Sequence, residues 1–273
     1  MHFKITEGPT SATLSYSFTQ EPDPQRFERH CHGSYELLYV AKGRGRYVVE
    51  GSEYPMTSHS LLLLRPYEYH YVCPERDHPY ERYVINFRPE APFFGKQISE
   101  SLMGEGTGVY FPAESISEGI RNAFESLHQL SQFPSRGRVE PEKEGSVLLR
   151  SVLTQILLLL GVAHPEQAPA AGENLLTEVI GYINENLQEP LTLDGLSRRF
   201  FVSKYALCRA FREYTGTTFL SYVTTKRIVA ARQMIEQGEA ATDVAYRVGF
   251  RDYSSFYRAY RKQTGHAPAW ERR

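Results

Sequence analysis

Cysteine, tryptophan and long apolar runs are scarce in this chain of 273 residues. It contains three cysteines and one tryptophan, and its longest apolar run is the eight residues from Ile156 to Ala163. Three widely spaced cysteines make neither a disulfide framework nor a CxxC metal pair, and so short an apolar run cannot cross a membrane. The first residues also lack the apolar segment of a secretory signal. We therefore expect a cytoplasmic protein of a reducing compartment with no membrane partner.

Charge is distributed unevenly along the chain, although the formal net charge is only -1. Residues 1–172 contain 16 Lys+Arg against 21 Asp+Glu, a net charge of -5, whereas residues 191–273 contain 15 against 7, a net charge of +8. A basic segment beside an acidic one is typical of a protein in which one domain meets a polyanion. Charge alone leaves an ordinary solvated helical surface equally open.

Short runs rich in aromatic and β-branched residues predict strands in the first 95 residues. Gly, Pro and Ser clusters separate these runs at intervals of roughly ten residues, which is typical of an antiparallel sandwich or barrel. The clearest runs are 35–40, 45–50, 60–65 and 81–87. We assign residues 1–112 to a β domain.

Helical spacing of apolar residues follows the β domain. One helix is expected between Ile116 and Leu130, and a second runs from Glu142 to about Ala163. The second helix is apolar around more than one face and must be buried, either within the monomer or against a second copy. We assign residues 113–163 to a helical dimerisation segment, and the Pro- and Ala-rich residues 164–172 to a linker.

An internal repeat occupies the C-terminal part, residues 173–273. The apolar pattern of Leu196, Phe200 and Val202 recurs 48 positions later, and that of Leu207, Arg209, Phe211 and Gly216 recurs 49 positions later as Phe256, Arg258, Tyr260 and Gly265. Each copy is predicted to form a short helix, a turn and a second helix closed by Thr-Gly. This is the pattern of a helix-turn-helix used twice, with second helices over 203–214 and 252–263.

Capping residues and a long connecting helix complete the predicted repeat. The expected N-caps are Thr192 or Asp194, Ser203, Thr242 and Asp252. Between the copies, Phe219–Glu236 is predicted to form one helix, which at ~1.5 Å per residue spans roughly 27 Å. A strut of that length can hold two recognition helices near the ~34 Å repeat of B-DNA.

The outward faces of the two second helices carry the residues that we expect to contact DNA. Arg can bond guanine with two hydrogen bonds, and Ser, Tyr and Lys reach phosphates or base edges. The matched Arg209 and Arg258 favour DNA contact over an ordinary solvated face. The predicted contacts are Lys204, Tyr205, Cys208, Arg209 and Arg212 in the first copy and Tyr253, Ser254, Tyr257, Arg258 and Arg261 in the second.

The second copy also carries a specific resemblance. The segment GFRDYSSFYRAYRKQTGHAP, residues 249–268, closely resembles the signature of the AraC/XylS family of bacterial transcription regulators. The resemblance covers about residues 174–271 and implies a regulator that binds promoter DNA. By position in the family motif, the residues nearest the bases are Tyr205, Ala206, Cys208 and Arg209, and Ser254, Ser255, Tyr257 and Arg258. Phe201 departs from the pattern, because it occupies a turn position often given to glycine.

Three histidines and a glutamate in the β domain form a candidate ligand set. His30, His32 and Glu36 would share one face of a strand and point into a barrel, and His70 follows in a later segment. Such a set suits a divalent metal such as Mn, Fe, Ni or Zn. The spacing resembles the first and second motifs of the cupin superfamily, a small β-barrel, and the sensor domains of many AraC-type regulators are similar.

Two interpretations of this set remain open. Either the four side chains hold a metal, or they line an effector pocket together with Arg65 and tyrosines such as Tyr47, Tyr69 and Tyr83. No cofactor is required in the second case, in which an organic effector such as a sugar or another metabolite is hydrogen-bonded directly.

These observations predict an α+β multidomain regulator. It would consist of a cupin-like antiparallel β-barrel that senses a small molecule, the helical dimerisation segment and an all-α double helix-turn-helix domain. Its expected partners are double-stranded promoter DNA, the effector and a second copy of the chain, with RNA polymerase as a further candidate. We expect no enzymatic activity. The alternatives are a metal-dependent cupin enzyme that carries a DNA-binding tail, and a ligand-independent regulator whose barrel is only a scaffold.

Overall fold

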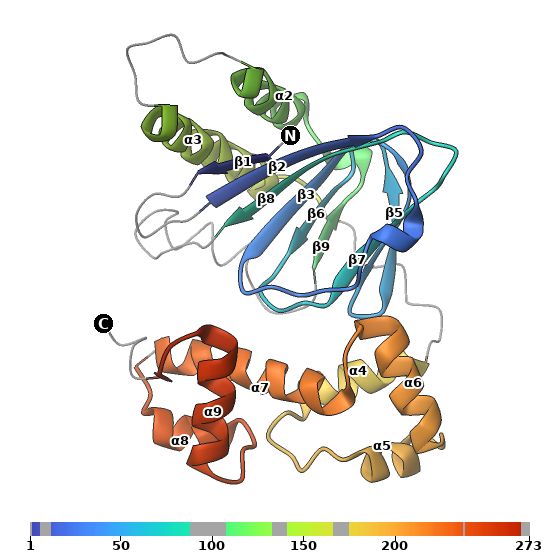
Figure 1. The fold of residues 1–273 in the computed structure, drawn as a ribbon, viewed down its shortest axis with the longest axis vertical. Coiled ribbons are helices and arrows are strands. Elements are labelled where there is room, and N and C mark those ends of the chain that lie inside the picture. Colours follow the sequence, from blue (N-terminus) through green and yellow to red (C-terminus); the bar gives the residue numbers. More distant parts are fainter. Residues whose placement is uncertain are drawn as a thin grey trace. The chain divides into compact units, whose positions relative to one another are not determined.

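A computed structural model describes residues 2–5, 12–87, 108–132, 141–165, 175–236 and 238–268. Residue contacts divide the chain into two units, one made of residues 1–27, 34–49 and 53–169 and the other made of residues 28–33, 50–52 and 170–273. Figure 1 shows strands and helices in the N-terminal part of the chain and helices alone from residue 175 onward. This α+β organisation agrees with the fold class expected from the sequence.

Two sheets make up the β domain in the described part of the chain. The larger has the strand order β1-β2-β8-β3-β6-β9 and the smaller the order β5-β4-β7. The strands are β1 (His2–Ile5), β2 (Ala12–Thr19), β3 (Tyr35–Lys42), β4 (Arg44–Val49), β5 (Ser52–Thr57), β6 (Leu61–Leu64), β7 (His70–Pro74), β8 (Tyr80–Phe87) and β9 (Val109–Phe111). The pairs β2–β8, β3–β8, β3–β6 and β4–β7 are antiparallel, as expected for a barrel of this class.

Strand β3 separates two hydrophobic cores, because successive side chains of a strand face opposite sides. Leu38 and Val40 pack between the sheets with Tyr47 of β4 and Met56 of β5. Leu37 and Tyr39 belong to a second core on the helix-covered face of the larger sheet. The space between the sheets is therefore filled largely by tyrosine and aliphatic side chains.

Helices α2 (Glu118–Gln132) and α3 (Pro141–Gly161) supply the other half of the second core. The rings of Tyr39 and Phe124 are stacked with their centroids 4.3 Å apart. On α3 the buried residues are Leu149, Val152, Leu153, Ile156, Leu157 and Leu160. The apolar character of α3 is thus explained mainly by burial within the monomer, although Leu158 remains 52% exposed. No helix in the described ranges is long and apolar enough to cross a membrane.

The first described helix after residue 170 is α4 (Leu175–Glu185), whose bounds were not predicted from the sequence. Most of the predicted linker, from residue 166 onward, lies outside the described residues. The first helix-turn-helix consists of α5 (Leu193–Arg199) and α6 (Lys204–Thr215), and the second of α8 (Ala241–Arg247) and α9 (Tyr253–Thr264). Helix α7 (Phe219–Glu236) joins them and has the predicted bounds.

Three of the predicted N-caps are present, and one prediction was wrong. Thr192, Ser203 and Asp252 each accept a hydrogen bond from the backbone N–H three residues later. Thr242 does not cap α8, because that helix begins one residue before it and follows Ala240, which has no capping side chain. Gly216 and Gly265 end α6 and α9 in the left-handed conformation, which glycine adopts without a steric penalty.

Helix α7 contacts α6 of the first copy and both helices of the second. Ile228, Ile235, Val244 and Phe256 form part of the core of the second copy. In the first copy the ring of Phe211 packs against Phe219 and Tyr222 of α7. Because α7 contributes to both cores, the two helix-turn-helix units share one structural element.

Candidate functional site

The two second helices present their predicted polar faces to solvent. Leu207 and Phe211 of α6, and Phe256 and Tyr260 of α9, are buried on the inner face. On α6 all the predicted contacts are exposed, namely Lys204, Tyr205, Ala206, Cys208, Arg209 and Arg212. On α9 Ser254, Arg258 and Arg261 are exposed, and Tyr253, Ser255 and Tyr257 are half-buried. Each copy therefore has one solvent-exposed helix face, which contains Arg209 in the first copy and Arg258 in the second.

Two cationic side chains of α6 form ion pairs with acidic neighbours. Lys204 forms an ion pair with Asp194 of α5, and Arg209 Nε lies 3.6 Å from Glu213 Oε1 one turn further along the helix. All four side chains are more than half exposed, so each pair contributes little to stability. A phosphate or a guanine edge can therefore replace the carboxylate at low cost.

Asp252 organises the N-terminus of α9. One of its carboxylate oxygens accepts the Ser255 N–H at 2.7 Å, and the other accepts the Ser255 hydroxyl at 2.9 Å. The backbone hydrogen bond from Ser255 is the main reason that the pKa of Asp252 is lowered. Arg258 Nη2 in turn donates to Ser255 Oγ at 3.4 Å. Ser255, a predicted DNA contact, thus lies inside the capping network and helps to orient Arg258.

The turns of the two copies differ at one equivalent position. Gly249 has a φ of +95°, and a Cβ there would lie 2.5 Å from the carbonyl oxygen of Leu187. Phe201, 48 residues earlier, adopts a φ of +54° and is 95% exposed. The left-handed conformation is strained for a residue other than glycine, and Phe201 loses no packing by adopting it.

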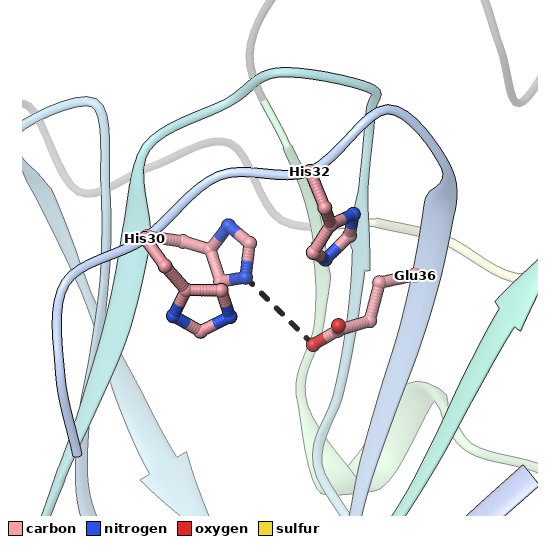
Figure 2. Close-up of side chains that lie close together, drawn as sticks. His30, His32 and Glu36 are labelled. Carbon is pink, nitrogen blue, oxygen red and sulfur yellow. Dashed lines mark ion pairs between the residues drawn. The ribbon is translucent and has the colours of Figure 1, made fainter. Parts of the chain in front are cut away.

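The candidate ligands of the β domain come together. One potential ligand atom from each of His30, His32, Glu36 and His70 lies within 4.8 Å of the others. Figure 2 shows the first three gathered around one point, with a dashed line for the pair between His70 Nε2 and Glu36 Oε1, which lie 3.9 Å apart. Glu36 and His70 are only 4% exposed.

The predicted reason for this convergence was partly wrong. Glu36 lies on β3 and shares the face of Leu38 and Val40, as expected. His30 and His32 precede the start of β3 at Tyr35, so strand alternation does not govern them. They reach the site because the connecting bend turns the loop back over Glu36.

Glu68, which the sequence analysis missed, supports this region in two ways. Its carbonyl oxygen lies 2.8 Å from His70 Nδ1, and its carboxylate accepts the Arg65 N–H at 2.8 Å. Arg65 Nη1 also lies 3.8 Å from the Glu68 carboxylate. The signal was available in the sequence, because Glu68 is the lone acid in a run of aromatic residues that ends at His70.

The tyrosines predicted for an effector pocket divide between the two faces of the larger sheet. Tyr47 is buried between the sheets, where its hydroxyl lies 3.0 Å from Ser60 Oγ. Tyr83 belongs instead to the core beneath the helices, with Phe124 as a neighbour. Tyr83 was therefore wrongly placed in the sequence analysis, because its position on β8 directs it away from the space between the sheets.

Two family models match the chain. One is described as an AraC-like ligand binding domain and matches residues 15–157; the other is a helix-turn-helix domain and matches residues 196–273. The first spans more than half of the chain. The chain belongs to the AraC family of transcriptional regulators. The resemblance inferred from the sequence is thereby confirmed, and so is the assignment of a ligand-binding N-terminal domain and a DNA-binding C-terminal domain.

Known proteins are similar to this chain over different shares of its length. The transcriptional activator RhaS of Yersinia pseudotuberculosis is 26% identical over 244 residues, which are 89% of this chain and 88% of RhaS. ToxT of Vibrio cholerae is 14% identical and covers 97% of this chain and 98% of its own, with a TM-score of 0.40. The DNA-binding domain of AdpA, solved with a target DNA, is 31% identical over 37% of this chain and 91% of its own, with a TM-score of 0.35.

Proposed function

We propose that this AraC-family regulator binds promoter DNA with both helix-turn-helix units, and that an effector in the β domain changes how strongly it binds. The matched exposed faces of α6 and α9 are the observation that supports this proposal most strongly. Effector binding would shift the population of DNA-binding states without chemical change to the ligand. The protein would then act as a cytoplasmic regulator rather than as an enzyme.

Arg258 is the proposed base-reading residue of the second copy. Its guanidinium donates to the Ser255 hydroxyl, which is itself held by the Asp252 carboxylate, and a guanidinium oriented in this way loses less entropy on binding. Arg261 lies nearly one turn further along α9, exposed and in the last turn, where a phosphate contact is expected. Arg209 is the proposed counterpart of Arg258 on α6.

The experiment is competition binding to the preferred DNA and to its single-base variants. Arg258→Ala should cost about 1–3 kcal/mol and relax the preference at one base pair. Arg261→Ala should weaken binding to every sequence alike and reduce the slope of affinity against salt by about one. Equal effects of both variants on all sequences would contradict base reading by Arg258.

We also propose that the chain forms a homodimer through α3. Leu158 is 52% exposed, and Val162, four residues further and just past the end of α3, is 77% exposed. Residues four apart lie on the same face of a helix, so the two side chains offer one apolar contact surface. RNA polymerase remains a proposed partner of the DNA-bound regulator.

A further inference from the structure

The side chain of Arg227, in the middle of α7, contacts both helix-turn-helix copies. We propose that Arg227 fixes the second copy relative to the first and thereby sets the spacing between the two DNA motifs that the protein accepts. This inference rests on the proposed function, in which both copies bind one DNA site. All the residues that carry it lie between 170 and 273, within a single unit of the chain.

On the side of the first copy, Arg227 binds the loop between α4 and α5. Its Nε donates to the carbonyl oxygen of Leu187 at 2.8 Å, and its Nη2 donates to that of Glu189 at 2.7 Å. Both distances are shorter than the usual ~2.9–3.0 Å of an N–H···O hydrogen bond. Two donors of one rigid group therefore tie this loop to α7.

The loop is in turn held to the first copy by the two helices that it connects. The ring of Tyr182 on α4 packs edge-on against Phe200 at the end of α5, with the centroids 5.8 Å apart. The Arg199 guanidinium also lies 4.1 Å from the centroid of the Tyr182 ring, in a cation–π contact. Because these contacts join α4 to α5, the position of the loop follows that of the first copy.

On the side of the second copy, Arg227 contacts the turn between α8 and α9. Its Cζ lies 6.0 Å from the centroid of the Phe250 ring, which packs edge-on against Phe256 of α9 at 5.4 Å. Gly249 approaches the same group, because a Cβ there would lie 2.8 Å from Arg227 Nη2 and 2.5 Å from the Leu187 carbonyl oxygen. One guanidinium group therefore connects the loop of the first copy to the turn that precedes α9.

The shape of the guanidinium group explains why arginine suits this position. It is planar and directs several N–H donors from one rigid group, so it can bind two carbonyl oxygens and lie over an aromatic ring at the same time. A lysine ammonium is a compact charge on a flexible stem and cannot reproduce this set of contacts. Arg227→Lys thus keeps the charge of the DNA-binding region while it loosens the connection between the copies.

Motif spacing is the property of DNA binding that should depend most on this connection. Each base pair inserted between two motifs moves the second by ~3.4 Å along the duplex and rotates it by roughly 35°. Two linked modules gain about 10²-fold or more in affinity only where both can bind together. A rigid connection therefore restricts the protein to one spacing, whereas a loose one admits neighbouring spacings as well.

The test measures the affinity of the full chain for three duplexes. The first carries the two motifs found by selection from a random pool, the second has two base pairs inserted between them, and the third keeps one motif. The insertion should weaken wild-type binding about tenfold or more, but weaken binding of Arg227→Lys and Arg227→Met by less than about threefold. Arg227→Lys should bind the single motif as the wild type does, whereas a general loss of stability would weaken binding to all three duplexes alike.

Arg247→Met is the matched control for the loss of one arginine. Arg247 lies on α8 and pairs with Glu239, so this variant breaks a contact within the second copy and leaves Arg227 in place. It should be as sensitive to the inserted base pairs as the wild type. Circular dichroism checks the fold of each variant, and Arg227→Lys serves as the test if Arg227→Met does not fold.

Two outcomes would overturn the inference, and they differ in what they say about the proposed function. Arg227 variants that discriminate between the two spacings as strongly as the wild type would show that Arg227 does not set the spacing, while binding by both copies would stand. A wild type whose affinity is the same for both spacings would contradict binding by both copies as well.

Discussion

Phe201 and Gly249 occupy equivalent positions in the two turns, and both have a positive φ. Glycine adopts this left-handed conformation without a steric penalty, whereas phenylalanine does not. Replacing Phe201 by glycine relieves a left-handed penalty of ~1–2 kcal/mol and adds a glycine entropy cost of ~0.5–1 kcal/mol. Phe201 is 95% exposed, so almost no packing is lost. Phe201→Gly should therefore raise the free energy of unfolding of the second unit by about 0–1.5 kcal/mol.

Gly249→Ala is the matched control in the second copy. Its Cβ would lie 2.5 Å from the Leu187 carbonyl oxygen and 2.8 Å from Arg227 Cζ, so the variant should lose about 2 kcal/mol or more. Urea unfolding of the full chain, followed by circular dichroism, measures both variants. A loss of stability in Phe201→Gly would contradict the assignment of strain to that turn.

His59 makes the stability of the β domain depend on pH. Burial, and secondarily the charge of Arg121, lower the pKa of His59 below its ordinary value of 6.5. Between this lowered pKa and 6.5, His59 therefore binds a proton more readily in the unfolded chain than in the folded one. This contribution to stability is complete above pH 6.5 and is lost as the pH falls through the lowered pKa.

His59→Asn tests this assignment, because asparagine does not titrate and tolerates the φ of +70° at this position. The free energy of unfolding should fall less between about pH 7.5 and about pH 5.5 in the variant than in the wild type. Equal losses would show that other groups account for the acid sensitivity.

At the scale of elements, α3 combines a buried face with an exposed apolar end. Leu158→Glu should weaken the proposed dimer more than tenfold, because it replaces an apolar contact worth about 1.5–3 kcal/mol with a charge. Sedimentation equilibrium measures the association constant. Gln129→Glu adds the same charge at an exposed position of α2, away from this face of α3, and should leave the dimer intact. A monomeric wild type, or equal weakening by both variants, would contradict an interface at Leu158.

The elements with the strongest periodic signals could be predicted from the sequence. Helix α7 and the second helices of both copies were expected at their observed positions within a residue or two, because apolar spacing and caps agree there. The start of α8 was predicted wrongly. Threonine is a common N-cap residue, but Thr242 lies inside this helix. Short strands such as β9 carry too few residues for a distinct pattern and depend on pairing with β6.

The candidate ligand set was predicted for partly mistaken reasons. Residue types and spacing identified His30, His32, Glu36 and His70, but sequence periodicity could not show that the first two lie in a loop. Glu68 was missed because its carbonyl acts through backbone geometry, which residue identity does not reveal. The face on which Tyr83 lies depends on the register of β8 against β3, which only the folded sheet determines.

At the scale of the whole molecule, a ligand-binding β domain is joined to a basic domain in which two helices are proposed to read DNA. The net charge of +8 over residues 191–273 provides non-specific attraction to phosphates. In the proposed function, sequence preference comes from the exposed faces of α6 and α9. Both faces belong to a unit organised around α7, so a single site that engages both copies is the central expectation.

Selection of bound DNA from a random pool by the full chain tests this expectation most directly. The account predicts enrichment of two short motifs on one face of the duplex, about one helical turn (~34 Å) apart, with Arg209→Ala and Arg258→Ala each relaxing a different motif. Enrichment of a single motif that neither variant changes, or no enrichment at all, would contradict it.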